Sequence, residues 1–115
     1  MKHISTLSFE LPILTQIQGQ NLDQWIRTLL WEGNLLGIGS SHQRISVHRT
    51  KGRIVAENGE EWILQGVGEV YEMKKIGEMA TELQSKIVLI GEGLQAETIK
   101  KSLAYTLALD TEHSK

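Results

Sequence analysis

The pair Asn58-Gly59 separates two short runs rich in β-branched and aromatic residues, Arg53 to Glu57 and Trp62 toward Tyr71. Asparagine and glycine both tolerate positive φ, which the type I′ turn of a two-residue hairpin requires at both central positions. The pair therefore predicts that the first run is a strand folded back antiparallel onto the second. Gly66 and Gly68 interrupt the second strand and indicate a bulge or a close backbone approach there.

Three further segments are predicted to be strands. Alternation of apolar and polar residues indicates half-buried strands at 6–11, closed by Pro12, and at 45–48. The continuous apolar run 86–90 indicates a short strand that lies centrally in the sheet or is covered on both faces.

Apolar residues at helical spacing predict two helices. The first begins at an Asn21 cap with Gln24 three residues later, follows a polar connector at 15–20, and ends at Gly33. Its core-facing residues are Leu22, Trp25, Ile26, Leu29 and Leu30. The second helix covers about 95–109, and its inward residues are Ile99, Leu103 and Leu107. The segment 74–84 is ambiguous, because four apolar residues fit one helical face while Gly77 disfavours a helix.

This order of elements predicts one α+β domain over residues 1–115, with a frayed tail at 110–115. We expect a largely antiparallel sheet of about four to five strands, with the helices packed on one face. The opposite face is expected to be polar, and therefore solvated or in contact with a polar partner. Its predicted residues are Thr6, Ser8, Glu10, Ser46 and His48.

Composition excludes several classes of protein. Twelve Lys and Arg against fourteen Asp and Glu give a net charge of −2, which disfavours nucleic acid or an anionic membrane as the main partner. The absence of cysteine excludes disulfides, thiolate metal sites and cysteine nucleophiles. The longest apolar run, 87–90, is far shorter than the ~18 residues of a membrane span, and the start turns polar too early for a signal peptide. A cytoplasmic location is expected.

Few residues are candidates for chemistry. The chain has no Gly-rich loop ending in Gly-Lys-Ser/Thr, which an NTPase needs for phosphate and magnesium. The imidazole metal ligands are His3, His42, His48 and His113, and none forms a helical pair or a short-spaced cluster. His42 and His48 are candidate metal ligands if the loop before the strand at 45–48 curls back. Alternatively, they are two surface histidines.

Three segments resemble the C-terminal domain of the CobW family. They are Arg49-Thr50-Lys51-Gly52, the run Trp62-Ile63-Leu64-Gln65-Gly66-Val67, and the run from Lys86 to Leu94. They are similar to an Arg-x-Lys-Gly strand end, a Trp-x-x-Gln-x-Val strand and a hydrophobic strand closing in Ile-Gly-x-x-Leu. Segments 5–10 and 29–32 look most like the eukaryotic branch, the zinc-regulated GTPase metalloprotein activators.

The resemblance implies a non-catalytic interaction and regulatory domain of a metallochaperone GTPase that delivers a metal, commonly zinc, to client metalloproteins. It implies no catalytic or cofactor-binding residue in this chain, because GTP, magnesium and zinc belong to the family's GTPase domain. The implied partners are that GTPase domain, in the same or a partner chain, a client metalloprotein and a second copy of the chain. Nucleic acid and membranes are not among them.

The resemblance also points to a partner-binding patch formed by Arg49, Lys51, Trp62 and Gln65. If the strands form a meander, these residues lie on neighbouring strands. Arg49 shares its parity with inward Val47, so its aliphatic stem is expected to be partly buried. A structural role is the alternative, with an Arg–Glu pair inside the domain and Trp62 filling the core.

Two other functions remain open. One is a self-contained metal-binding module that uses His42 and His48, which a zinc titration would detect. The other is a small enzyme of unrecognised type on an α+β scaffold, which a substrate-sized apolar pocket with convergent polar groups would favour.

Overall fold

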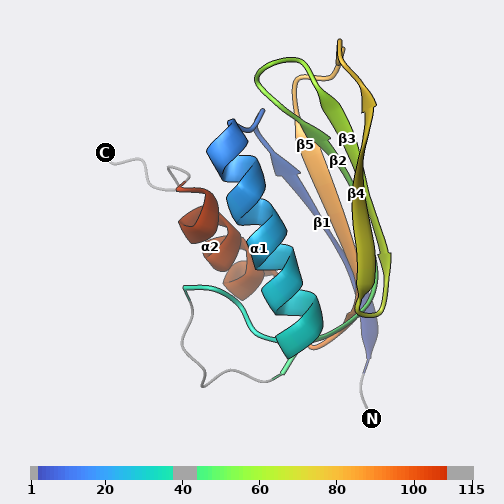
Figure 1. Cartoon of the computed structure of the whole chain (residues 1–115). Helices are drawn as coiled ribbons and strands as arrows, with labels where there is room; N and C mark the ends of the chain where they lie inside the picture. The colour runs from blue at the N-terminus through green and yellow to red at the C-terminus, as the bar shows by residue number, and fades with distance from the viewer. Residues whose placement is uncertain (1–2, 38–43, 109–115) are drawn as a thin grey trace.

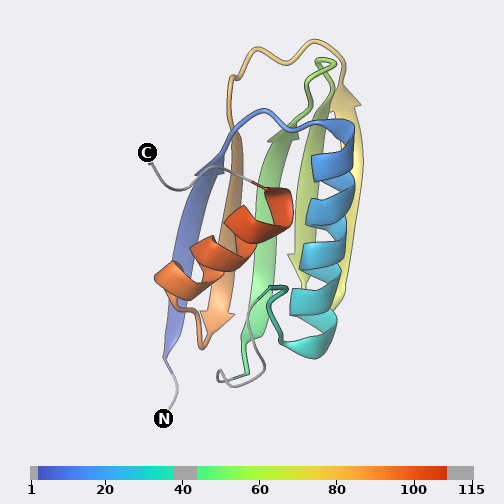
Figure 2. The same ribbon diagram turned by 90° about the vertical axis from the view of Figure 1, so that its left-hand side faces the viewer.

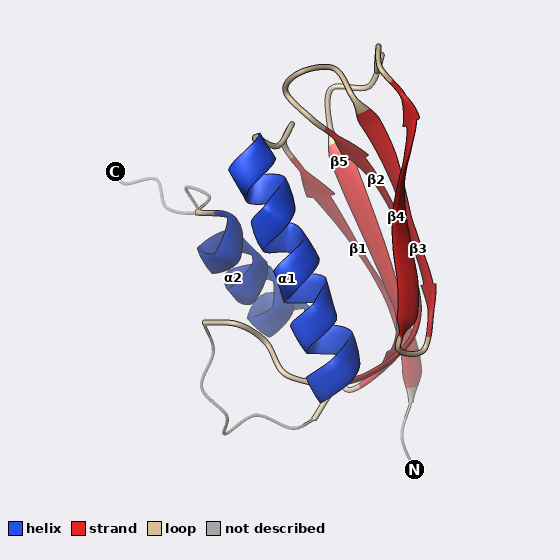
Figure 3. Cartoon of the chain, in the orientation of Figure 1, coloured by secondary structure: helices blue, strands red, loops and turns tan. Residues whose placement is uncertain are grey.

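The computed structural model describes residues 3–37 and 44–108, and they form a sheet layer and a helix layer (Figures 1 and 3). Along the chain the elements are β1 (Ile4–Leu11), α1 (Gln16–Glu32), β2 (Ser46–Val55), β3 (Glu61–Val67), β4 (Val70–Gly77), β5 (Ser85–Glu92) and α2 (Ala96–Leu107). The strands form one antiparallel sheet in the order β1-β5-β2-β3-β4. The predicted α+β class, with helices on one face, is confirmed. The predicted tail at 110–115 lies outside the described residues.

The two helices divide the sheet between them. In Figure 2, α2 lies over the β1–β5 side and α1 over the β3–β4 side. The apolar run 86–90 becomes β5, an interior strand with β1 and β2 as neighbours. Its position is central as predicted, but only one face is covered: Ile87 and Leu89 are 0% exposed, whereas Val88 and Ile90 are half-buried. No helix of the described residues is long and apolar enough to cross a membrane.

Helix α1 begins at Gln16, five residues before the predicted cap at Asn21. Thr15 is the actual N-cap: its hydroxyl accepts from the backbone N–H of Gln18 at 3.1 Å, and the Gln18 side chain accepts from the Thr15 N–H at 2.9 Å. This capping box lies inside the segment predicted to be a connector, and it outweighs the low helix propensity of Gly19. The predicted end at Gly33 is confirmed, with φ of 68°.

Helix α2 has the predicted inward face, since Ile99, Leu103 and Leu107 are all buried. Its last carbonyl, that of Leu107, accepts a hydrogen bond of 2.8 Å from the side chain of Gln18. This bond joins the first turn of α1 to the last turn of α2. The two helices lie in one layer on the same face of the sheet and cross obliquely, as Figure 2 shows.

A buried hydrogen-bond relay holds the helix layer together. The indole Nε1 of Trp25 donates to the Ser102 hydroxyl at 2.8 Å, and that hydroxyl donates to the carbonyl of Leu36. Trp25 is 0% exposed, whereas Trp31 on the same helix is 52% exposed. One tryptophan is thus core and the other lies at the surface, because side chains six residues apart on a helix point in different directions.

The strands predicted at 45–48 and 53–57 form one continuous strand, β2, with a bulge at His48. Val47 pairs with Gly91 and Arg49 with Ile90, so His48 is the extra residue. A bulge reverses the parity of the strand beyond it. Val47 and Thr50 are therefore both buried, and Arg49 is exposed. The prediction that Arg49 shares the inward direction of Val47 is wrong for this reason.

The strand predicted from Trp62 toward Tyr71 is two strands, β3 and β4, joined by a turn at Gly68-Glu69. The predicted close approach at Gly66 is confirmed, because a Cβ there would lie 2.9 Å from the Cβ of Tyr71. The ambiguous segment 74–84 forms no helix: its first part completes β4, and its apolar residues Ile76, Met79 and Leu83 are exposed. Residues 74–77 form a strand and not a helix, because they pair with β3.

The β2–β3 hairpin is confirmed, but its turn is not the predicted type I′. Gly59 has φ of 93°, whereas Asn58 does not have positive φ. The N–H of Gly59 donates to the carbonyl of Ala56, and the N–H of Ala56 donates to the carbonyl of Glu60, both at 2.9 Å. These two hydrogen bonds define a three-residue loop, 57–59, whose last residue has positive φ. Glycine is therefore favoured at position 59 alone, and position 58 has no such requirement.

Gly59→Val is expected to lower the free energy of unfolding by at least ~1 kcal/mol, because a β-branched residue is strained at positive φ. A side chain there would also meet the carbonyl oxygen of Glu78, 2.9 Å from the Cβ position. Urea denaturation followed by circular dichroism measures the change. Asn58→Ala is the matched control in the same loop and is expected to have a smaller effect. Equal stability of Gly59→Val and the wild type would contradict this account of the turn.

Candidate functional site

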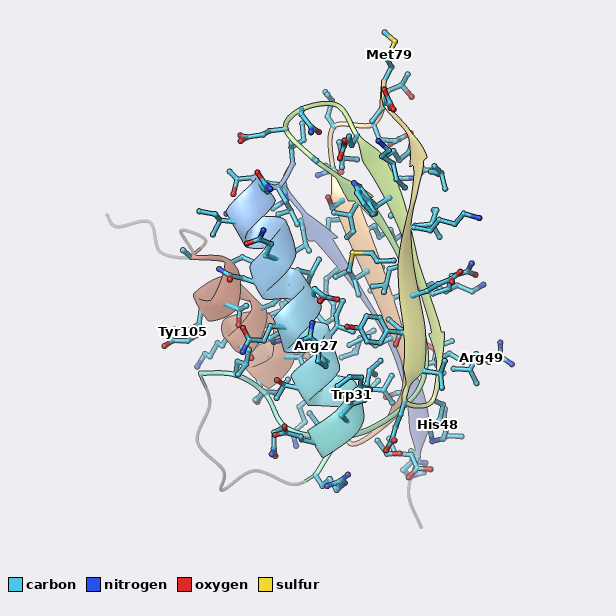
Figure 4. The ribbon with its side chains drawn as sticks, in the orientation of Figure 1. Arg27, Trp31, His48, Arg49, Met79 and Tyr105 are labelled. Atoms are coloured by element: carbon cyan, nitrogen blue, oxygen red, sulfur yellow. The ribbon has the colours of Figure 1, made fainter. Side chains whose placement is uncertain are left out.

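The face of the sheet opposite the helices is the outer face, and three of the four predicted partner-binding residues lie on it. Lys51 on β2 pairs with Gln65 on β3, and both side chains are exposed. Arg49 is the next outward residue of β2, and Figure 4 shows it pointing away from the helix layer. The predicted proximity of these three residues on neighbouring strands is therefore present in the fold.

Trp62 does not belong to this patch. It pairs with Ile54 and lies half-buried on the helix-facing side, packed against the core. Its Nε1 donates to Glu60 Oε1 at 3.2 Å. Burial raises the pKa of Glu60, but the hydrogen bond from Trp62 and the charge of Lys75 outweigh it and hold that pKa below its usual value. The sequence alone could have shown that Trp62 and Gln65 lie on opposite faces, because residues 62 and 65 have opposite parity on one strand.

Exposed aliphatic residues accompany the basic ones on the outer face. Val67 pairs with Arg49 on one side and with Val70 on the other, and the two valines are 64% and 77% exposed. Thr6, Ser8, Glu10, Ser46 and the half-buried His48 occupy this face as expected. The outer face is thus more apolar than predicted, because the valines on both sides of the unforeseen β3–β4 turn contribute to it.

Arg49 and Lys51 differ from Arg53 in their ion pairing, although Glu72 lines the same shallow hollow of the outer face as both of them. In the described residues neither forms an ion pair, whereas Arg53 on the same strand lies 2.8 Å from Glu61. The Arg–Glu pair considered as a structural role therefore involves Arg53 and not Arg49. Two cations beside exposed valines form a surface suited to a partner with carboxylates and apolar side chains.

Of the two candidate metal ligands, His42 and His48, only His48 lies among the described residues. His42 lies outside them, and His48 Nε2 is 3.5 Å from Glu92 Oε2. Within 3–37 and 44–108 there is no group of three His, Cys, Asp or Glu side chains that could hold a metal ion. A tetrahedral zinc site needs four ligands, and a histidine–glutamate pair supplies two at most.

A polar cluster that the sequence analysis did not identify links α1 to β4. The Tyr71 hydroxyl donates to Asp23 Oδ1 at 2.7 Å, and Arg27 is ion-paired with the same carboxylate. Burial and the bond to Asp23 raise the pKa of Tyr71, so the phenol stays protonated. The guanidinium of Arg27 also lies 5.9 Å from the ring centroid of Trp31 (Figure 4). The sequence does contain one sign of this cluster, because an Asp and an Arg four residues apart on a helix can form an ion pair.

Comparisons with known proteins agree with this fold. The family model "Cobalamin synthesis protein cobW C-terminal domain" matches residues 6–107. The chain is 32% identical over 97 residues to Zinc-regulated GTPase metalloprotein activator 1 of Schizosaccharomyces pombe, and the match covers 79% of this chain and 23% of the relative.

Two crystal structures of the YjiA GTPase from E. coli share the fold. One is the Zn(II)-bound protein, and the other is a Zn(II)-bound triple mutant of it. Each has a TM-score of 0.62 and 20% identity, and the match covers 90% of this chain and 29% of that one. The chain thus spans about a quarter of the length of these relatives.

Proposed function

Because this chain belongs to the family of cobW C-terminal domains, we propose that it is a non-catalytic interaction domain that packs on a GTPase domain. In this role it takes part in handing a metal, zinc in the first place, to a client metalloprotein. The names of the relatives support this proposal, since one is a zinc-regulated GTPase and another is a Zn(II)-bound GTPase. GTP, magnesium and zinc are expected to be bound by the GTPase domain and not by the residues of this chain.

The observation that carries the proposal is the outer face of the sheet. Neither helix covers it. On three adjacent strands, β2, β3 and β4, it combines exposed valines with two cations that form no ion pair within the described part of the chain. The central part of a protein interface is depleted in charge and its rim is polar, and this face has both components. We expect Val67 and Val70 to be buried at the interface, with Arg49 and Lys51 meeting acidic groups beside them.

The test adds a GTPase domain in trans. The GTPase domain of the S. pombe relative is loaded with GDP or with a non-hydrolysable GTP analogue, and its affinity for this chain is measured by calorimetry. Arg49→Ala combined with Lys51→Ala is expected to weaken binding about tenfold, which corresponds to ~1.4 kcal/mol. Both side chains are exposed, so the variant should remain folded.

Lys100→Ala combined with Lys101→Ala is the matched control, because it removes two exposed cations from α2 in the other layer. Its binding should equal that of the wild type. A difference in affinity between the GDP and GTP-analogue states would show that the contact is coupled to the nucleotide. If the outer-face variant binds as tightly as the wild type in both states, the interface lies elsewhere.

A further inference from the structure

A groove runs between the first half of α1 and the β2–β3 hairpin, on the helix-facing side of the sheet. Its volume is about 750 Å³. Its floor is apolar, and the floor residues are Leu14, Ile54, Trp62 and Met73. Its rim is polar and comes from one face of α1 and from the hairpin loop. An apolar floor with a polar rim is the usual construction of a peptide or ligand site.

Gly19 lies in the wall of this groove, in the second turn of α1. A glycine inside a helix is less stable than alanine and is normally kept where a neighbour approaches closely. Within 3–37 and 44–108 no such neighbour exists, because a Cβ at position 19 would meet nothing within 4 Å. The packing of these residues therefore does not explain this glycine. A molecule lying in the groove would explain it.

Three glutamines continue the same wall. Gln16, Gln20 and Gln24 are exposed, line the groove and are spaced four residues apart. Unlike Gln18, which bonds to Leu107, they have no hydrogen-bond partner in the part of the chain that the structure describes. A primary amide offers both donors and an acceptor, as a peptide backbone does. On a helix this row is ~12 Å long, which equals three to four residues of extended chain.

The charges of the groove favour a basic occupant. Its rim contains three carboxylates, those of Asp23, Glu57 and Glu60, and one cation, Arg27. Arg27 is ion-paired with Asp23, and Lys75 binds Glu60. Glu57 is exposed and forms no ion pair with any described residue. The end of the groove at the hairpin loop is therefore complementary to a lysine or arginine.

We propose that this groove binds an extended segment of a partner protein, about four residues long. The glutamine row hydrogen-bonds its backbone, an aliphatic side chain rests on Trp62 and Met73, and a basic side chain lies beside Glu57. Gly19 leaves room for the segment against the helix. The groove lies on the helix side, so this contact is separate from the outer-face contact and does not depend on it.

The probe is a pool of acetylated, amidated hexapeptides with one fixed leucine, one fixed lysine two residues later, and Ala, Ser or Gln elsewhere. Binding is followed by ¹H–¹⁵N spectra, in which each tryptophan gives its own indole signal. Saturable shifts are expected for the Trp62 indole and for the amides of 16–24. The Trp25 indole is fully buried outside the groove and should not move. A pool with glutamate in place of lysine should bind about fivefold more weakly.

Gly19→Leu separates a binding groove from a purely structural one. It should abolish the peptide shifts by filling the groove, and at the same time raise thermal stability because leucine favours a helix. Gln20→Ala should weaken binding without loss of stability. Gln95→Ala, at an exposed glutamine before α2 and outside the groove, is the matched control and should bind as the wild type does.

Four results would overturn the proposal. The first two are the absence of saturable shifts at Trp62 and shifts that survive Gly19→Leu. The third is equal shifts from N-acetyl-leucine amide, which would indicate a small-molecule site. The fourth is shifts confined to the outer face, which would place the peptide in the other contact.

Discussion

Trp25→Ala is expected to lower the free energy of unfolding by about 3–5 kcal/mol, the range for removing a large aromatic residue from a core. Trp25 is 0% exposed and joins α1 to Ser102 of α2 through its indole N–H. Truncation leaves a cavity between the helices and the sheet and also removes the donor of the relay that ends at Leu36. A small domain is typically stable by about 5–15 kcal/mol, so this single change removes a large share.

Urea denaturation followed by far-UV circular dichroism measures this loss without relying on tryptophan fluorescence. Trp31→Ala is the matched control, since it removes the same side chain from the same helix at a site that is 52% exposed. Its cost should stay near ~1 kcal/mol, because it loses an exposed hydrogen bond to Glu69 and little packing. If the two variants lose equal stability, Trp25 is not the centre of the core.

Gly91→Ala should destabilise the fold by at least ~2 kcal/mol, because the added methyl group has no space. Its Cβ would lie 2.2 Å from the carbonyl oxygen of Ser46 and 2.8 Å from the Cα of Val47. Both are backbone atoms of β2, held by pairing with β5 and by the bulge at His48. Relief would require the two central strands to separate at that point.

Gly19→Ala is the matched control for Gly91→Ala, because the substitution is identical and no atom of the described residues lies within 4 Å of the new methyl group. It should stabilise the protein by about 0.5–1 kcal/mol through helix propensity alone. The two variants are therefore expected to change the melting temperature in opposite directions. A stable Gly91→Ala variant would contradict the close packing of β5 against β2.

The helices and the fold class could be predicted from the sequence because periodicity is local. Leu22, Trp25 and Leu29 specify the buried face of α1 whatever lies against it. The sheet register could not be predicted in the same way. The bulge at His48 arises from the pairing of β2 with β5, about forty residues away, and it alone turns Arg49 to the outer face. The turn at Gly68 likewise depends on β4 pairing with β3 instead of forming a helix.

Part of the candidate site could also be predicted from the sequence. Arg49, Lys51 and Gln65 could be placed on adjacent strands from the hairpin signal, whereas the side of Trp62 required the register. The groove beside α1 was beyond prediction, since it exists only because the first half of α1 and the β2–β3 hairpin meet across the fold. Its one visible sign in the sequence is Gly19, which interrupts an otherwise helical segment.

The position of β5 between β1 and β2 affects how this chain folds as well as what holds it together. Of the strands in the described residues, β5 is the last to be synthesised, yet it is the one that pairs with β1 and one of the two that pair with β2. Until β5, which begins at Ser85, is available, β1 lacks its partner strand, and the sheet consists of the β2–β3–β4 meander. Pairing Ile4 with Glu92 closes most of the chain in a single contact, and such non-local contacts slow folding. Completion of the domain is therefore a late event that follows the synthesis of nearly all of its residues.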